Sequence, residues 1–291
     1  MKHRFTSDSH CPRLQLILAA TMATTLTLGL PSRSTQAFPL RDLIFRGIQV
    51  IQISNLSDQQ EIDIGNQMHQ NLVNRGLRVS SNRTLNSYVD AIGQRLVKAG
   101  ARRDISYTFL VVEDSQVNAF ATMGGRVYIT TGLMRTAANE AELASVIAHE
   151  VGHIEDRHLV KQIRQRMVAQ GVVAAATGSS RNQLANLGVE LALNRPNSRS
   201  HEFEADEEGL RILREADYAT SAMPDFMRKL LSPSTQQTPT FLSTHPAVPD
   251  RVSALEENIR AGEKNQCDRN PTQVSCGLST SDYQRRVLRQ L

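Results

Sequence analysis

The sequence predicts an α+β domain in which a small β-sheet is followed by a mostly helical body. Two helical patterns come first, at 56–76 and 81–100. Two short segments of alternating apolar residues follow at 105–113 and 125–132, and they indicate strands. Helical periodicity then dominates from 139 to about 259, so the helical body follows the sheet along the chain.

The first two helices and the strand pair carry their own start and stop signals. Ser57 can cap the first helix and Gly76 can end it. In the second helix apolar residues recur on one face, and Gly100 can stop it. The pair Gly124–Gly125 indicates a turn or bulge between the two predicted strands.

Residues 1–37 have the features of an export signal. A basic start precedes an apolar run at 14–30, and small residues at Thr35 and Ala37 suit cleavage after Ala37. An uncleaved N-terminal anchor is the alternative, because a run of roughly 17 residues reaches the lower limit for spanning a bilayer. We therefore predict an exported protein of the periplasm or another extracytoplasmic compartment, with membrane association through the leader left open.

After the leader we predict one domain at 38–262 and a polar, loosely held tail at 263–291. Cys267 and Cys276 could form a disulfide in an oxidising compartment, and two unpaired thiols are the alternative. The leader holds four Lys/Arg and one Asp, a charge of +3, so the rest of the chain has 4 − 3 = +1. A charge this small argues against a nucleic-acid-binding stripe or a polybasic membrane patch.

The motif “HEVGH” is the strongest chemical signal in the chain. It lies in a predicted helix that Asn139 can cap, with Glu142 reaching back as in a capping box. His149 and His153 are four residues apart, so both imidazoles project from one helix face and can bind one divalent ion. Glu150 can stand beside that ion without binding it and accept a proton from an attacking water. A solvated, His-rich helix face is the alternative.

A catalytic zinc site needs a third protein ligand. A third histidine would be expected at position 159, where the chain has Leu159, and His158 is one position off and is expected to point elsewhere. Glu190 and Glu202 are the first acidic candidates after the motif, with Glu202 favoured over Glu190. Asp206 lies one helical turn after Glu202 and could orient a ligand histidine. An acidic solvent face is the alternative for this cluster.

The order of two motifs, “HEVGH” and then “SRSHEFEAD”, resembles a family of zinc metalloendopeptidases. This is metallopeptidase family forty-eight, with the CAAX prenyl protease, HtpX and BepA, and the resemblance covers most of 57–258. It implies a zincin-like metalloprotease domain with the small sheet next to the active-site helix. It also implies one Zn²⁺ per chain, held by His149, His153 and Glu202, with Asp206 orienting a ligand histidine.

The same resemblance implies roles for residues outside the two motifs. His245 and Arg251, from “HPAVPDR”, would stabilise the oxyanion that forms when water attacks a carbonyl. In some relatives this histidine instead approaches the zinc as a blocking fourth ligand. The segment “NAFATMGGRVYITTG” is similar to the family's substrate-side edge strand, so Gly125, Arg126 and Val127 are expected to bind a peptide as an added strand. A plain structural hairpin is the alternative.

We therefore predict a zinc-dependent metalloendopeptidase that hydrolyses misfolded or membrane-associated exported proteins, with Glu150 as general base. A zinc-stabilised, chaperone-like binding protein with little turnover is the alternative. Imidazole and carboxylate ligands also suit Mn²⁺, Co²⁺ and Ni²⁺, and zinc is chosen on ligand type and family pattern. Polypeptides are the expected partners and nucleic acids are not, while the oligomeric state stays open. No further membrane span and no repeat domain like that of BepA is apparent, so a stand-alone exported member is expected.

Overall fold

The computed structural model describes residues 55–102, 104–170, 178–232, 239–246 and 249–291. The predicted leader and its cleavage position lie outside these residues. Within the described part of the chain, no helix combines the length and the apolar character needed to cross a bilayer.

The first two predicted helices form as α2 (Asp58–Asn74) and α3 (Arg83–Ala99). Ser57 caps α2 through a capping box. Gly76 has a φ of +100°, and this left-handed conformation ends the helix without the strain that a side chain would bring. Gly100 is the C-cap of α3. Both helix predictions are confirmed because local capping signals and one apolar face agree at each segment.

The sheet has three strands, β1 (Thr108–Val112), β2 (Ala119–Thr122) and β3 (Arg126–Thr130). Their order across the sheet is β1-β3-β2, with β1 parallel and β2 antiparallel to β3. β3, the last of the three strands in the sequence, therefore lies in the middle of the sheet. The short β2 at one edge was not predicted as a strand of its own.

The prediction of an exposed edge at Gly125, Arg126 and Val127 is wrong. Arg126 and Val127 pair with β1 on one side and with β2 on the other, so this edge of the sheet belongs to β2. Gly125, at φ +84°, accepts a hydrogen bond from Thr108 at 2.9 Å, and a Cβ there would lie 2.8 Å from the Ser106 carbonyl oxygen. Alternating apolar residues indicate a strand but not its neighbours, so the sequence could not show that β3 is central.

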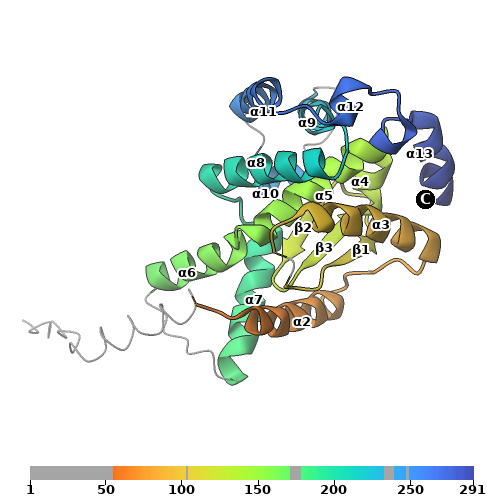
Figure 1. The fold of residues 1–291 in the computed structure, drawn as a ribbon. Coiled ribbons are helices and arrows are strands. Elements are labelled where there is room, and N and C mark those ends of the chain that lie inside the picture. Colours follow the sequence, from red (N-terminus) through yellow and green to blue (C-terminus); the bar gives the residue numbers. More distant parts are fainter. Residues whose placement is uncertain (1–54, 103, 171–177, 233–238, 247–248) are drawn as a thin grey trace, which may run out of the picture. The chain divides into compact units, whose positions relative to one another are not determined.

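The helical body is built around α5 (Glu140–Glu155), in which every residue from Ala141 to Ile154 is buried. Figure 1 shows α5 between the sheet and α8 (Arg199–Glu215). Gly152 permits their close contact, because a Cβ there would lie 2.8 Å from the Ala205 carbonyl oxygen. A small sheet with a large helical body confirms the predicted α+β class. The other helices of the body are α4 (Thr131–Thr136), α6 (His158–Gln170), α7 (Gly178–Asn194), α9 (Ala222–Leu231), α10 (Thr240–Thr244) and α11 (Pro249–Ala261).

The tail after Gly262 is packed against the domain, so the expectation of a loosely held segment is wrong. Cys267 and Cys276 form a disulfide, and both are buried. The Gly277 carbonyl accepts a hydrogen bond from the Ala141 amide at the start of α5, at 2.9 Å. The average polarity of the tail conceals these few buried anchors. Its elements are α12 (Gln266–Arg269), α13 (Thr280–Arg286) and two short 3₁₀ turns, Val274–Cys276 and Leu288–Gln290.

Candidate metal centre

The α5 half of the centre is arranged by helix geometry. Asn139 accepts a hydrogen bond from the Glu142 amide at 2.9 Å and starts the helix. His149 and His153 then lie one turn apart, with their Nε2 atoms separated by 3.1 Å. Both side chains are buried. The spacing in the motif thus brings two imidazole nitrogens to one point inside the protein.

The third group at this point is Glu202, from the first turn of α8. Its Oε2 lies 3.5 Å from His149 Nε2, and its Oε1 lies 3.3 Å from His153 Nε2. Glu190, the other candidate, is instead half-exposed and forms an ion pair with Arg195 at 3.7 Å. Packing of α8 on α5 therefore selects Glu202 and leaves Glu190 at the surface.

The donor atoms fit a small tetrahedral cation. Zinc bonds of about 2.0–2.1 Å place two tetrahedral ligand atoms about 3.3–3.4 Å apart. The three separations among His149, His153 and Glu202 are 3.1, 3.3 and 3.5 Å. Two imidazole nitrogens and a carboxylate oxygen are also the donor types that zinc accepts. The geometry and the chemistry of these residues therefore suit Zn²⁺.

His245 occupies the fourth corner of the same cluster. Its Nδ1 lies 3.3 Å from His149 Nε2 and 3.1 Å from Glu202 Oε1. The ligand atoms of these four residues converge closely enough to hold one ion. Of the two roles left open for His245, this position matches the blocking fourth ligand better than an oxyanion donor standing away from the metal.

Asp206 and Arg251 stand behind the ligands. Asp206 Oδ1 accepts from His149 Nδ1 at 2.9 Å, which is the contact expected of a residue that orients a ligand histidine. The buried Arg251 guanidinium donates to Asp206 at 2.7 Å twice and to Glu202 at 2.6 Å. Arg251 is thus directed at two carboxylates, and its predicted contact with a reacting carbonyl is replaced by a positioning contact.

The charges of these buried groups depend on their neighbours. Burial opposes a charge on His149, but hydrogen bonds with Asp206 and Glu202 outweigh it and raise the pKa of His149 to about 9. Burial lowers the pKa of His153 well below its usual value, and Glu202 offsets this only in part. Burial also opposes the charge of Glu202, yet the surrounding histidines hold its pKa well below the ordinary value. Glu202 is therefore ionised, as a metal ligand must be.

Glu150 lies beside the cluster and is almost fully buried. The Ala121 amide on β2 hydrogen bonds its carboxylate, and burial raises its pKa. Among the described residues its Oε1 has no hydrogen-bond partner, although His245 Nε2 lies 3.4 Å away. A buried carboxylate with one uncommitted oxygen is suited to take up a proton.

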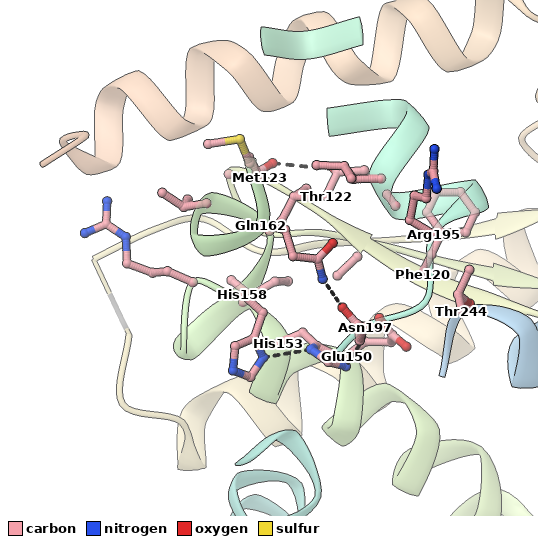
Figure 2. A pocket seen from close by; sticks show the side chains of 18 of the residues that line it. Phe120, Thr122, Met123, Glu150, His153, His158, Gln162, Arg195, Asn197 and Thr244 are labelled. Carbon is pink, nitrogen blue, oxygen red and sulfur yellow. Dashed lines mark hydrogen bonds between the residues drawn. The ribbon is translucent and has the colours of Figure 1, made fainter. Parts of the chain in front are cut away.

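A small cavity of about 50 Å³ opens beside Glu150 and His153. Figure 2 shows these two side chains on its wall, with Phe120 and Thr122 contributed by β2. The edge strand therefore lines the same cavity as the proposed base.

Asn197, in the turn between α7 and α8, belongs to this centre and was not anticipated. Its Nδ2 lies 3.3 Å from His245 Nδ1 and 3.5 Å from His153 Nε2. Gln162 hydrogen bonds its Oδ1, as Figure 2 shows. An asparagine between two helices is typical of any turn, so the sequence carries no signal for this role.

His158 is not among the converging ligand atoms, as expected, but it does not point away from the centre. Helix α5 ends at Glu155, and Arg157 adopts a φ of +53°, so the regular helix is interrupted before α6 begins at His158. This turn places His158 Nδ1 2.8 Å from His153 Nδ1, and His158 Nε2 3.0 Å from Glu204 Oε2. Helical spacing could not reveal the contact because the helix does not continue through these residues.

Comparison with known proteins identifies the family. The sequence profile described as Peptidase family M48 matches residues 83–259. The beta-barrel assembly-enhancing protease of Escherichia coli (strain K12) is 31% identical over 258 residues, which cover 83% of this chain and 52% of that protein. A putative protein of the same description from Vibrio cholerae is 32% identical over 223 residues, covering 71% of this chain and 46% of that protein.

A relative of similar length is also found. The metalloprotease LoiP of Escherichia coli (strain K12) is 26% identical over 253 residues, covering 84% of this chain and 96% of that protein. By contrast, the chain spans about half the length of the two beta-barrel assembly-enhancing proteases. The predicted zincin-like fold and the predicted family of zinc metalloproteases are confirmed, and the chain belongs to peptidase family M48.

Proposed function

We propose that this chain is a zinc-dependent metalloendopeptidase that hydrolyses peptide bonds in misfolded or membrane-associated exported proteins. The observation that carries the proposal is the convergence of His149, His153 and Glu202 beside a buried Glu150 with an uncommitted oxygen. A cavity lined by an edge strand adjoins these residues, as peptide binding requires.

His149, His153 and Glu202 would hold one Zn²⁺ per chain. When bound, zinc supplies a Lewis acid that polarises a carbonyl and lowers the pKa of a water molecule. Asp206 keeps the His149 proton on Nδ1, so that Nε2 is free to bind the ion. Arg251 fixes the orientation of both Asp206 and Glu202.

Glu150 would act as general base and then as general acid. It takes a proton from the attacking water and delivers that proton to the nitrogen of the leaving amine. Burial raises its pKa, which makes it a better proton acceptor than a surface carboxylate. Its hydrogen bond from the Ala121 amide holds the carboxylate at the edge of the sheet.

The substrate would bind as an extended strand along β2 rather than at the originally expected residues of β3. β2 is at the edge of the sheet, borders the cavity and contacts Glu150. In this arrangement Gly125, Arg126 and Val127 would not contact the substrate backbone. They would hold β2 in place, because Arg126 and Val127 pair with β2. Export rests on the basic and apolar leader pattern, and polypeptides are the proposed partners.

A second candidate function is supported by the position of His245. With Nδ1 at 3.1–3.3 Å from two of the ligand atoms, this residue could close the fourth position and leave a zinc-stabilised binding protein with little turnover. Such a protein would need no base. A cleavage assay with wild type and a Glu150 variant separates the two candidates.

The test compares purified full-length wild type with Glu150→Gln. Casein cleavage is expected to fall by about 10²–10⁴-fold, because glutamine has the same shape but cannot accept the proton. Zinc content, measured by atomic absorption, should stay at one ion per chain. A Glu150→Gln protein that cleaves casein at the wild-type rate would remove Glu150 from the mechanism. Wild type that holds zinc and suppresses client aggregation without cleaving anything would favour the binding protein.

A further inference from the structure

His158 is a buried histidine that the mechanism above does not use. It is the first residue of α6, and its side chain is 1% exposed. One ring nitrogen, Nδ1, lies 2.8 Å from Nδ1 of His153, and Figure 2 shows this contact at the cavity wall. The other, Nε2, lies 3.0 Å from Oε2 of Glu204 on α8.

The proton positions along this chain of contacts follow from the ligand role of His153. Its Nε2 faces His149 and Glu202, so as a metal ligand this nitrogen carries no proton. The proton of His153 is then on Nδ1 and is donated to His158 Nδ1. A neutral His158 that accepts at Nδ1 carries its own proton on Nε2, which donates to Glu204. One assignment satisfies both hydrogen bonds and leaves the metal-facing nitrogen free.

We propose that His158, with Glu204 behind it, is a positioning residue that fixes the ring orientation and tautomer of the ligand His153. The inference rests on the ligand set of the proposed function. Hydrogen bonding to the outer nitrogen of a ligand histidine increases the basicity of the metal-binding nitrogen, so His158 strengthens metal binding without touching the metal.

A competing explanation is that His158 binds a second ion together with Asp156 and Glu204, whose ligand atoms also lie close together. An ion on His158 Nε2 would move the His158 proton to Nδ1, where it faces His153 Nδ1 at 2.8 Å. His153 would then have to accept that proton's hydrogen bond and carry its own proton on Nε2, the metal-facing nitrogen. A second ion would therefore disable the first site, and we favour the positioning role.

Two substitutions of His158 distinguish a role as hydrogen-bond acceptor from a role that only fills space. In His158→Asn the side-chain oxygen takes the place of Nδ1 and can accept from His153. In His158→Leu the volume is kept but the acceptor is lost. His201→Leu is the matched control, because the His201 ring stacks on His158 at 4.3 Å while its buried Nδ1 has no hydrogen-bond partner among the described residues.

The measurement is the zinc dissociation constant of the full-length protein, obtained by competition with a chromogenic chelator. His158→Leu is expected to raise the constant by about 10–100-fold, as loss of such an outer partner does elsewhere. His158→Asn should stay within about threefold of wild type, and so should His201→Leu. The visible absorption of the Co²⁺-loaded proteins should change in His158→Leu and be restored in His158→Asn.

A third variant keeps the test valid if substitution of the buried His158 prevents folding. Glu204 is half-exposed, so Glu204→Ala should fold normally and still raise the zinc dissociation constant about two- to fivefold. Equal constants for wild type, His158→Leu and Glu204→Ala would overturn the proposal. So would two zinc ions in wild type with one lost in His158→Leu, which would establish the second site. Wild type that binds no zinc would refute the proposed function itself, a result distinct from either of these.

Discussion

His149 and His153 leave the same helix one turn apart, yet their outer nitrogens meet different supports. His149 donates directly to Asp206, a buried carboxylate that Arg251 holds with two hydrogen bonds. His153 instead contacts His158, which passes the hydrogen bond to the half-exposed Glu204. His149 is therefore supported by a buried ion pair, and His153 by two successive hydrogen bonds that end at a half-exposed carboxylate.

The two supports differ in how strongly their charges interact. Charges inside the protein interact strongly and are costly to leave unpaired, whereas water and salt screen a surface carboxylate. We therefore expect changes behind His149 to affect both folding and metal binding. Changes behind His153 should affect mainly metal binding, and by smaller amounts as they approach the surface.

The largest effect is expected from Arg251→Met. This change leaves Glu202 and Asp206 buried without their cation, so the free energy of unfolding should fall by about 3–5 kcal/mol. Urea unfolding followed by circular dichroism measures it. Arg285→Met is the control, because its exposed pair with Asp282 should contribute about 0–1 kcal/mol. An equal fall in the free energy of unfolding in the two variants would mean that the buried ion pairs of Arg251 stabilise the fold no more than the exposed pair of Arg285.

Removing zinc tests whether both supports serve one ligand set. An ion that binds only the folded chain adds about 4 kcal/mol at a free concentration a thousand times its dissociation constant. Calorimetry with and without a chelator should therefore show a large fall in melting temperature for wild type. An equal melting temperature with and without the chelator would contradict a metal held by His149, His153 and Glu202.

Asp206→Asn should weaken zinc binding by about 10–100-fold. The amide oxygen can still accept from His149, but it lacks the negative charge that strengthens this contact and pairs with Arg251. Chelator competition gives the constant. Glu207→Gln, an exposed acid next to Asp206 on α8, should leave it unchanged. If both variants bind zinc like wild type, the buried carboxylate is not a support.

The smallest effect is expected from Glu204→Gln. The glutamine oxygen can still accept from His158 Nε2, so only a half-exposed charge is lost. The cost should be below about 1 kcal/mol, or roughly fivefold in the zinc dissociation constant. A loss as large as that of Asp206→Asn would show that both supports depend equally on charge and would end the contrast between them.

Residues whose neighbours are close in sequence were the predictable ones. The caps at Ser57 and Asn139 and the pairing of His149 with His153 follow from helix geometry, which fixes positions three and four residues apart. The ligand position of Glu202 could be proposed only with a family pattern beside it, because an acidic helix face satisfies the same spacing. Its meeting with His153 depends on how α8 packs on α5.

The errors share one physical cause: the pattern of residues along a segment does not show which distant segments pack against it. The resemblance implied an edge strand within 118–132, and the exposed backbone was expected at Gly125, Arg126 and Val127, whereas the edge lies at β2 and β3 is central. The tail was expected to be loosely held because of its polarity, although buried Cys267 and Cys276 anchor it. Arg251 was expected near the reacting carbonyl, and burial among carboxylates directs it elsewhere.

The helix that carries His149, Glu150 and His153 could be predicted from the amino-acid sequence, because capping, apolar periodicity and a four-residue spacing act within one helix. Which side chains complete the metal centre and support its ligands depends instead on the packing of elements that are distant in sequence. His245, Asn197 and His158 reach the centre across turns whose directions depend on packing of the whole domain. Local conformational preferences fix the first set of positions, and burial of elements distant in sequence fixes the second.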